Sequence, residues 1–150
     1  MDQLYQAHGL HLAFPEGWEL NEEQHAERMT ITVSSPATSF WCLSLFEPGV
    51  QPDEVIDSVL ETFGEVYDEL DVYEAEASMG GLPTSARDLQ FVCHELINSA
   101  FLRAFRTDQH TMLVLFQGTD DELEETRETL DAITASLAWS LGGGLGPPPE

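Results

Sequence analysis

Few residues of this chain could carry out catalysis, and their spacing does not form a catalytic group. Cys93 and His94 are neighbours on a predicted strand, so their side chains point to opposite faces and cannot form a thiolate–imidazolium pair. Ser78 lies beside a diglycine turn without a recognisable base, and the Gly-x-Ser-x-Gly motif of serine hydrolases does not occur. Because no nucleophile, base and orienting group can be placed together, we expect that the protein is not an enzyme.

Metal and cofactor chemistry have equally little support from the residue types. His8 and His11 are three residues apart at an expected loop-to-strand junction, and neither Cys-x-x-Cys nor His-Glu-x-x-His occurs. The chain has no lysine, which excludes a Schiff base and the lysine of a phosphate-binding loop. We therefore expect neither a metal site nor a cofactor.

The composition is strongly acidic, and the acid is unevenly distributed. The 150 residues include 5 basic side chains, all arginine, against 28 acidic ones, which gives a formal net charge of −23. Nucleic acids and anionic membranes are therefore not expected as partners, because both bind basic surfaces. Residues 1–76 and 120–150 carry the whole excess of acid, and residues 77–119 are neutral. This acidic coat either keeps the surface solvated or steers a basic partner toward it.

The ends and the cysteines indicate the compartment. The N-terminus has no basic stretch followed by an apolar run, and no apolar run approaches the length of a membrane span. We therefore expect a cytoplasmic protein. Cys42 and Cys93 are too few for a disulfide framework, and we expect them as small buried apolar side chains.

The apolar periodicity predicts a single α+β domain over residues 1–141, with residues 142–150 as a flexible Gly/Pro tail. Alternating and β-branched segments predict strands at residues 10–14, 28–34, 40–46, 72–79, 87–97, 100–107 and 110–117. An apolar stripe at helical spacing predicts a helix over residues 52–70. A second helix should run from Thr119 to about Ala138, opened by a capping box in which Glu122 returns the hydrogen bond of Thr119.

The last three predicted strands contain the candidate site. Two-residue turns at Asn98–Ser99 and Asp108–Gln109 would pair His94 with Arg103, and Arg103 with Val114. One face of this meander should be apolar with His94 and Arg103 as a polar notch; its residues are Val92, Leu96, Phe101, Phe105, Met112, Val114 and Phe116. The other face, which includes Ala100 and Ala104, should pack closely against a helix. The notch is either an anion or carboxylate pocket, or the place where Arg103 pairs with a helix carboxylate beside a neutral His94.

Three short motifs resemble a known family. They are the turn Phe14-Pro15-Glu16-Gly17-Trp18, the segment Gly81-Leu82-Pro83-Thr84-Ser85-Ala86 before the meander, and Ala135-Ser136-Leu137 at the end of the last helix. Over about residues 8–139 this layout resembles the Mog1/PsbP-like fold, including the bacterial DUF1795 group. The resemblance implies an antiparallel sheet flanked by helices. It also implies a mostly non-catalytic family, with a Ran-binding protein, photosystem subunits and type VI secretion effector chaperones among its members.

These observations lead us to expect a non-enzymatic, chaperone-like or accessory protein that binds another protein, and a secretion effector is one such partner. The partner would offer a basic or apolar segment, and the contacts would come from His94, Arg103, Phe101, Phe105 and Met112. The alternative is a small-ligand or anion-binding domain that uses the His94/Arg103 notch. The sequence leaves the oligomeric state open, a dimer included.

Overall fold

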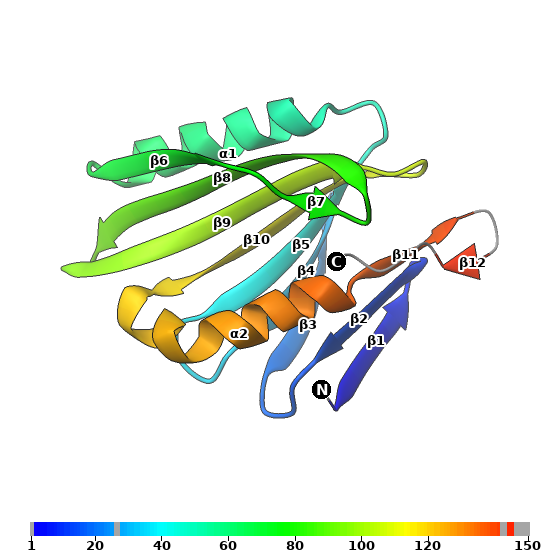
Figure 1. Ribbon diagram of the computed structural model, residues 1–150, viewed down its shortest axis with the longest axis horizontal. Coiled ribbons are helices and arrows are strands. Elements are labelled where there is room, and N and C mark those ends of the chain that lie inside the picture. The colour runs from blue at the N-terminus through cyan, green and yellow to red at the C-terminus, as the bar shows by residue number, and fades with distance from the viewer. Residues whose placement is uncertain (1, 26–27, 142–143, 146–150) are drawn as a thin grey trace.

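The computed structural model describes residues 2–25, 28–141 and 144–145, which form two antiparallel sheets and two helices in one α+β domain (Figure 1). The larger sheet has the strand order β3-β4-β5-β10-β9-β8-β6, and β7 pairs with β8 beside this path. Its strands are β3 (Glu19–Gln24), β4 (Arg28–Ser34), β5 (Phe40–Phe46), β6 (Leu70–Ala75), β7 (Ser78–Met79), β8 (Leu82–Cys93), β9 (Leu96–Arg106) and β10 (Thr111–Thr119). The smaller sheet contains β1 (Gln3–Ala7), β2 (Leu10–Phe14), β11 (Ala138–Leu141) and β12 (Gly144–Leu145).

Helices α1 (Pro52–Val66) and α2 (Asp120–Ser136) cover opposite faces of the larger sheet (Figure 1). Helix α1 begins with Pro52 in its first turn, where the missing N–H costs nothing, and with two acidic residues at its positive end. It ends four residues earlier than predicted. Tyr67 adopts an extended conformation and its ring packs against Phe91, and Leu70 then begins strand β6 opposite the same Phe91.

Each helix closes its own hydrophobic core. Under α1 the buried residues are Val55, Ile56, Leu89, Phe91, Ala100, Leu102, Ala104 and Leu113. Ala100 and Ala104 are fully buried there, so the expected close packing of a helix on this face is confirmed. Under α2 the sheet contributes Phe101, Phe105, Met112, Val114 and Phe116, and the helix contributes Leu123, Leu130 and Ile133.

The predicted strands 10–14, 28–34 and 40–46 match β2, β4 and β5 at both ends. The single strand predicted over 72–79 divides into β6 and β7, which pair with different parts of β8. Strands β1 and β3 were not predicted, because both are largely polar and exposed. Most of the predicted tail, residues 142–143 and 146–150, lies outside the described residues. Cys42 and Cys93 are both free and partly buried, and burial raises the pKa of the Cys42 thiol.

The turn between β8 and β9 is the largest departure from the predicted meander. The chain turns at His94–Glu95, where both residues have positive φ (52° and 64°), and Cys93 pairs with Leu96. The predicted turn at Asn98–Ser99 is therefore wrong, and both residues lie within β9. The next turn, at Asp108–Gln109, is confirmed, because the Thr107 N–H donates to the His110 carbonyl.

Candidate functional site

Three of the five predicted contact residues are core residues. Phe101, Phe105 and Met112 lie on the sheet face that α2 covers, and all three are buried. The ring of Phe105 also packs against that of Trp139 on β11, at 5.4 Å between centroids. The expectation that these three side chains contact a partner is therefore wrong for this structure. Their apolar face exists, but helix α2 and the smaller sheet cover this part of it, and Leu96, which was predicted on this face, lies on the opposite one, where it pairs with Cys93.

His94 and Arg103 do not meet, so the predicted notch does not form. His94 lies in the turn at the end of the β8–β9 hairpin, and it is exposed. Arg103 lies well inside β9, where its neighbours across the sheet are Ala86 on β8 and Val114 on β10. The pairing with Val114 is as predicted. The pairing with His94 fails because the hairpin turns four residues earlier than Asn98–Ser99.

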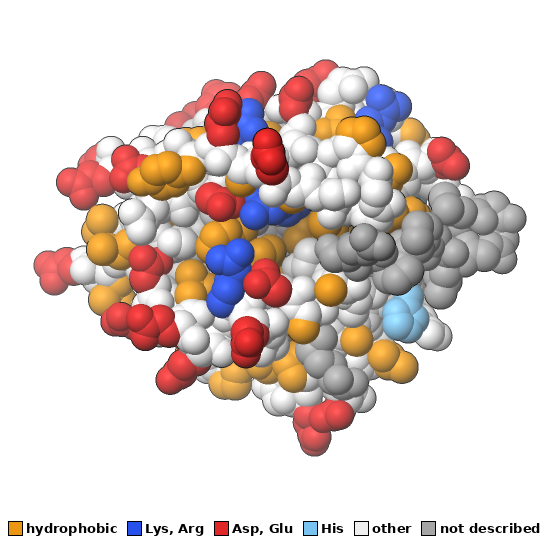
Figure 2. Space-filling view, in the orientation of Figure 1, with side chains coloured by type: hydrophobic (Ala, Val, Ile, Leu, Met, Phe, Trp, Pro, Cys, Tyr) orange, Lys and Arg blue, Asp and Glu red, His pale blue; other side chains and the backbone are white. Residues whose placement is uncertain are grey.

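Arg103 instead lines a groove between helix α2 and strand β7, which we call the α2 groove. It has a volume of about 390 Å³ and is lined by Ala77, Ser78, Met79, Arg103, Phe116, Arg127, Asp131, Thr134 and Ala135. Figure 2 views this side of the molecule, and basic side chains lie near its centre with hydrophobic ones beside them and acidic ones around them. Two of the five arginines of the chain thus converge on one groove.

Arg103 forms the buried side of the groove and is neutralised by a strand carboxylate. Its side chain is only 12% exposed, and its Nη1 lies 2.9 Å from Oδ1 of Asp88. The same nitrogen donates to the main-chain carbonyls of Leu102, at 2.9 Å, and Arg87, at 3.4 Å. An arginine this buried needs such a partner, because an unpaired charge is costly away from water. Arg103 therefore pairs with a carboxylate, as one alternative expected, but the carboxylate comes from β8 and not from a helix.

Arg127 forms the opposite side of the groove and was missed as a site residue. Its guanidinium carbon lies 4.0 Å from the ring centroid of Phe101, which stacks with Phe116 at 5.0 Å. Its Nε donates to Oδ1 of Asp131 at 3.2 Å. The sequence contained a signal for this position. Arg127 falls between Leu123 and Leu130 at helical spacing, so it belongs to the stripe of α2 that faces the sheet.

One end of the same sheet face remains uncovered, beyond the first residue of α2. Asp120 accepts hydrogen bonds from Gln90 and Ser99, at 3.3 and 2.7 Å, which fixes the start of the helix over this pair of strands. On this face, Val92 and Ile97 are the next pair toward the hairpin turn, and their side chains are 40% and 51% exposed. We call these two side chains, together with Tyr73, the open surface.

Tyr73 is the member of the open surface that lies beside the ion pair of Arg103 and Asp88. It lies on β6, where it pairs with Asp88, the partner of Arg103, and it is 53% exposed. Alternation along the strand places it on the same face as Asp88. Exposed acidic residues lie beside the open surface in the adjoining strand and turn; they are Asp71 and Glu95.

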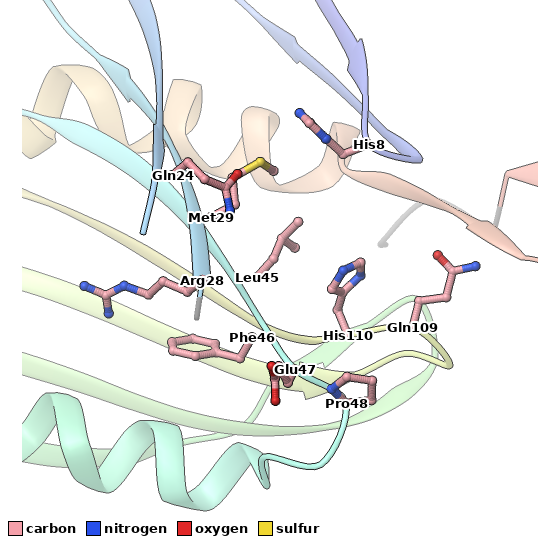
Figure 3. Close-up of a pocket in the computed structure, with 10 residues that line it drawn as sticks. All are labelled: His8, Gln24, Arg28, Met29, Leu45, Phe46, Glu47, Pro48, Gln109 and His110. Atoms are coloured by element: carbon pink, nitrogen blue, oxygen red, sulfur yellow. The ribbon is translucent and has the colours of Figure 1, made fainter. Parts of the chain in front are cut away.

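A second cavity, of about 320 Å³, lies at the other end of the larger sheet (Figure 3). Its polar lining includes His8, Arg28 and His110, and the guanidinium carbon of Arg28 lies 6.0 Å from the ring centroid of Phe46, which also lines the cavity (Figure 3). The Nε2 atom of His8 lies 3.1 Å from Oε1 of Glu22. Burial lowers the pKa of His110, which favours the neutral imidazole. Across the described residues, no three His, Cys, Asp or Glu side chains are grouped so as to hold a metal ion.

No protein-family model and no curated protein matches this sequence. Among the described helices, none is both long enough and apolar enough to cross a lipid bilayer.

Solved structures do match in fold. LpqN of Mycobacterium tuberculosis, involved in cell envelope biogenesis, is similar with a TM-score of 0.57 and 13% identity, over 92% of this chain and 83% of that one. Cyanobacterial PsbP (CyanoP) of Synechocystis sp. PCC 6803 is similar with a TM-score of 0.57 and 10% identity, over 92% of each chain. The chain therefore has the PsbP-like fold that its motifs resemble, and at these identities the likeness concerns the fold alone.

Proposed function

We propose that this chain is a non-enzymatic, chaperone-like accessory protein, and that it binds an apolar and basic segment of another protein on the open surface. The observation that carries the proposal is the exposure of Tyr73, Val92 and Ile97 on a sheet face that is otherwise covered by α2. Val92 and Ile97 lie directly opposite each other on neighbouring strands, and Tyr73 lies further along the same face. Exposed hydrophobic side chains gathered on one face are typical of protein-binding surfaces.

The exposed area is large enough to matter for affinity. Complete burial of a valine or isoleucine side chain contributes about 1.5–3 kcal/mol, so covering two half-exposed ones contributes about 2 kcal/mol together. That difference corresponds to more than a tenfold change in a dissociation constant.

The charge around the open surface supports a basic partner. Asp71 and Glu95 lie beside the surface, and the whole chain carries a net charge of −23. Such a field attracts a positively charged segment and speeds its association at low salt.

We further propose that the chain acts in the cytoplasm and belongs with the effector chaperones of the bacterial DUF1795 group. The support is the resemblance of its three motifs to that group, together with the PsbP-like fold. In this form of the proposal the partner is a secretion effector, and the apolar segment that docks is part of the effector.

A crosslinked pull-down from the native host, with mass spectrometry, tests the proposal. The test variant is Val92→Ser with Ile97→Ser, and the control is Leu4→Ser, because Leu4 is also an exposed hydrophobic residue but lies on β1. We expect the wild type and the control to enrich the same partner, and the double variant to lose at least tenfold of it. Equal capture by all three proteins would overturn the proposal.

A second function, the binding of a small carboxylate ligand, is favoured by the two arginines of the α2 groove. Arg103 and Arg127 take the place of the predicted His94/Arg103 pair, and each guanidinium group has five N–H donors, more than its single carboxylate partner uses. Native mass spectrometry of the purified protein tests this function. A co-purifying acid that is present in the wild type and absent from Arg127→Ala supports it, and identical spectra exclude it.

A further inference from the structure

Strand β6 is an open edge of the larger sheet. The other edge, β3, lies against the smaller sheet, where Tyr5 and His8 both contact Glu22. β6 pairs with β8 on one side, and no strand of the described residues pairs with its other side (Figure 1). Its four middle residues, 71–74, are all exposed.

An edge strand presents a row of unpaired backbone N–H and C=O groups, which a further strand can pair with. Natural proteins usually protect such edges with charged side chains, lysine above all, or with proline, a bulge or a very short strand. β6 has six residues, contains neither lysine nor proline, and pairs with β8 without a bulge. Val72 (44% exposed) and Tyr73 stand at its centre, and alternation points them to opposite faces of the sheet. The edge therefore offers both backbone groups and apolar side chains.

The charges of this segment decide which strand can pair with it. Residues 68–76 carry five acidic side chains and no basic one; they are Asp68, Glu69, Asp71, Glu74 and Glu76. In a symmetric pairing of two copies, these acids would face acids, and like charges opposite one another destabilise a strand pair. A basic strand would instead form opposite-charge pairs along its length. The edge thus rejects a second copy and accepts a basic segment.

We propose that β6 is the docking edge for an extended segment of the partner, which adds to the larger sheet as a further strand and has basic residues opposite Asp71 and Glu74 and apolar residues opposite Val72 and Tyr73. The inference rests on the proposed function for the nature of the partner, a protein. It adds how the partner is held. Backbone hydrogen bonds to β6 supply affinity, and Val72 and Tyr73 contact side chains of the added strand on opposite faces of the sheet.

The probe is an acetylated and amidated eight-residue peptide that repeats Lys-Val-Val-Lys, a spacing that matches Asp71-Val72-Tyr73-Glu74 of β6. Its controls are the same peptide N-methylated at every residue, which keeps the charge but cannot donate backbone hydrogen bonds, and a peptide with glutamate in place of lysine. We expect hydrogen exchange of the β6 amides to slow at least tenfold with the probe. We expect both control peptides to bind at least tenfold more weakly.

Two protein variants with equal net charge locate the contact. Val72→Lys should weaken binding of the probe at least fivefold, and Leu4→Lys should change it less than twofold, since Leu4 lies on β1 in the smaller sheet. Equal weakening by both variants would mean that charge alone attracts the peptide, and it would overturn the proposal.

The remaining outcomes separate this inference from the proposed function. Protection that falls on residues 92–97 and spares β6 would overturn the edge proposal and leave the open surface as the binding site. Protection of β6, combined with equal capture of partners by the Val92→Ser/Ile97→Ser variant, would support the edge and overturn the open surface. A dimer in sedimentation without peptide, converted to a monomer by Val72→Lys, would make a second copy the occupant and overturn the proposal.

Discussion

Glu122 joins helix α2 to the turn between β4 and β5, and its substitution tests how the α2 face is assembled. Its carboxylate accepts hydrogen bonds from the backbone N–H groups of Thr38, at 2.8 Å, and Ser39, and from the Thr38 hydroxyl at 3.1 Å. Its own backbone N–H donates to Oγ1 of Thr119, 3.3 Å away. One residue thus connects the start of the helix with the turn that leads into β5.

Glu122→Gln keeps the shape of the side chain but replaces one acceptor oxygen with an NH₂ group that faces donors. A hydrogen bond to a charged acceptor contributes about 1.5–3 kcal/mol, and the carboxylate is only partly buried, so water replaces part of what is lost. We therefore expect the free energy of unfolding to fall by about 2 kcal/mol. For a domain of this size, that change lowers the Tm by about 4–8 °C.

The pH dependence of this loss has a definite sign. Partial burial alone would raise the pKa of the Glu122 carboxyl, but hydrogen bonds from Ser39 and Thr38 outweigh burial and lower this pKa below its ordinary value. A carboxyl whose pKa is lowered by folding stabilises the protein fully above its unfolded pKa, and this contribution is lost as the pH falls through the folded pKa. The difference between wild type and Glu122→Gln should therefore be constant near neutral pH and close progressively in acid.

Urea unfolding at several pH values measures both quantities, with Glu124→Gln as the control. Glu124 is exposed on the same helix, so its substitution removes the same charge without breaking the contact to the turn. We expect the control to change stability by less than 0.5 kcal/mol, as is usual for surface substitutions. A Glu122→Gln variant as stable as the control, or a difference that grows in acid, would refute the assigned role of the carboxylate.

Three further predictions concern the acidic coat, the close contact of Gly118 with Ser39, and the turn between β8 and β9. Moderate salt should raise the Tm, because it screens the repulsion within a chain of net charge −23; a calorimetric Tm that stays flat or falls would contradict this. Gly118→Ala should destabilise the fold by about 1–3 kcal/mol in urea unfolding, because the added Cβ would lie 2.5 Å from the Ser39 hydroxyl; a neutral variant would show that the turn yields freely. Glu95→Gly should stabilise it by about 1 kcal/mol, because Glu95 has a φ of 64°, and an unchanged Tm would show that the turn is unstrained.

The capping box shows what the sequence could predict at the start of α2 and where local reasoning failed. Thr119 accepts from the backbone of Glu122, as predicted, because this contact depends only on spacing within one turn of helix. The Glu122 carboxylate was expected to return the bond to Thr119, and it instead binds a turn more than eighty residues away in sequence. The local contact was predictable from spacing alone, whereas the tertiary one required knowing that this turn lies against the helix.

The turn of the β8–β9 hairpin was predicted at the wrong residues for a related reason. Asn98 and Ser99 are residue types that often form turns. His94 and Glu95 are not typical of a two-residue turn, because both must adopt a positive φ, which asparagine and glycine adopt more readily. The early turn lets Leu89 pair with Ala100 and Arg87 with Leu102, over ten pairs from Thr84 to Cys93. The gain from this long ladder exceeds the cost of two strained residues, which is of order 1–3 kcal/mol each.

The alternation of side chains along a strand explains why most of the predicted face is correct although the register was wrong, whereas the predicted notch is not. In the predicted register Ile97 pairs with Ala100, and in the structure Leu89 does, a shift of eight residues. An even shift keeps Val92 on the face of Phe101 and Arg103, whereas Leu96 and Ile97, which belong to β9 instead of the preceding strand, exchange faces. The partner of Arg103 does depend on register, and it changes from His94 to Asp88. Alternation therefore predicts which residues of a strand share a face, whereas the groups that meet within that face depend on turns and on the docking of α2, which brings Arg127 to the groove.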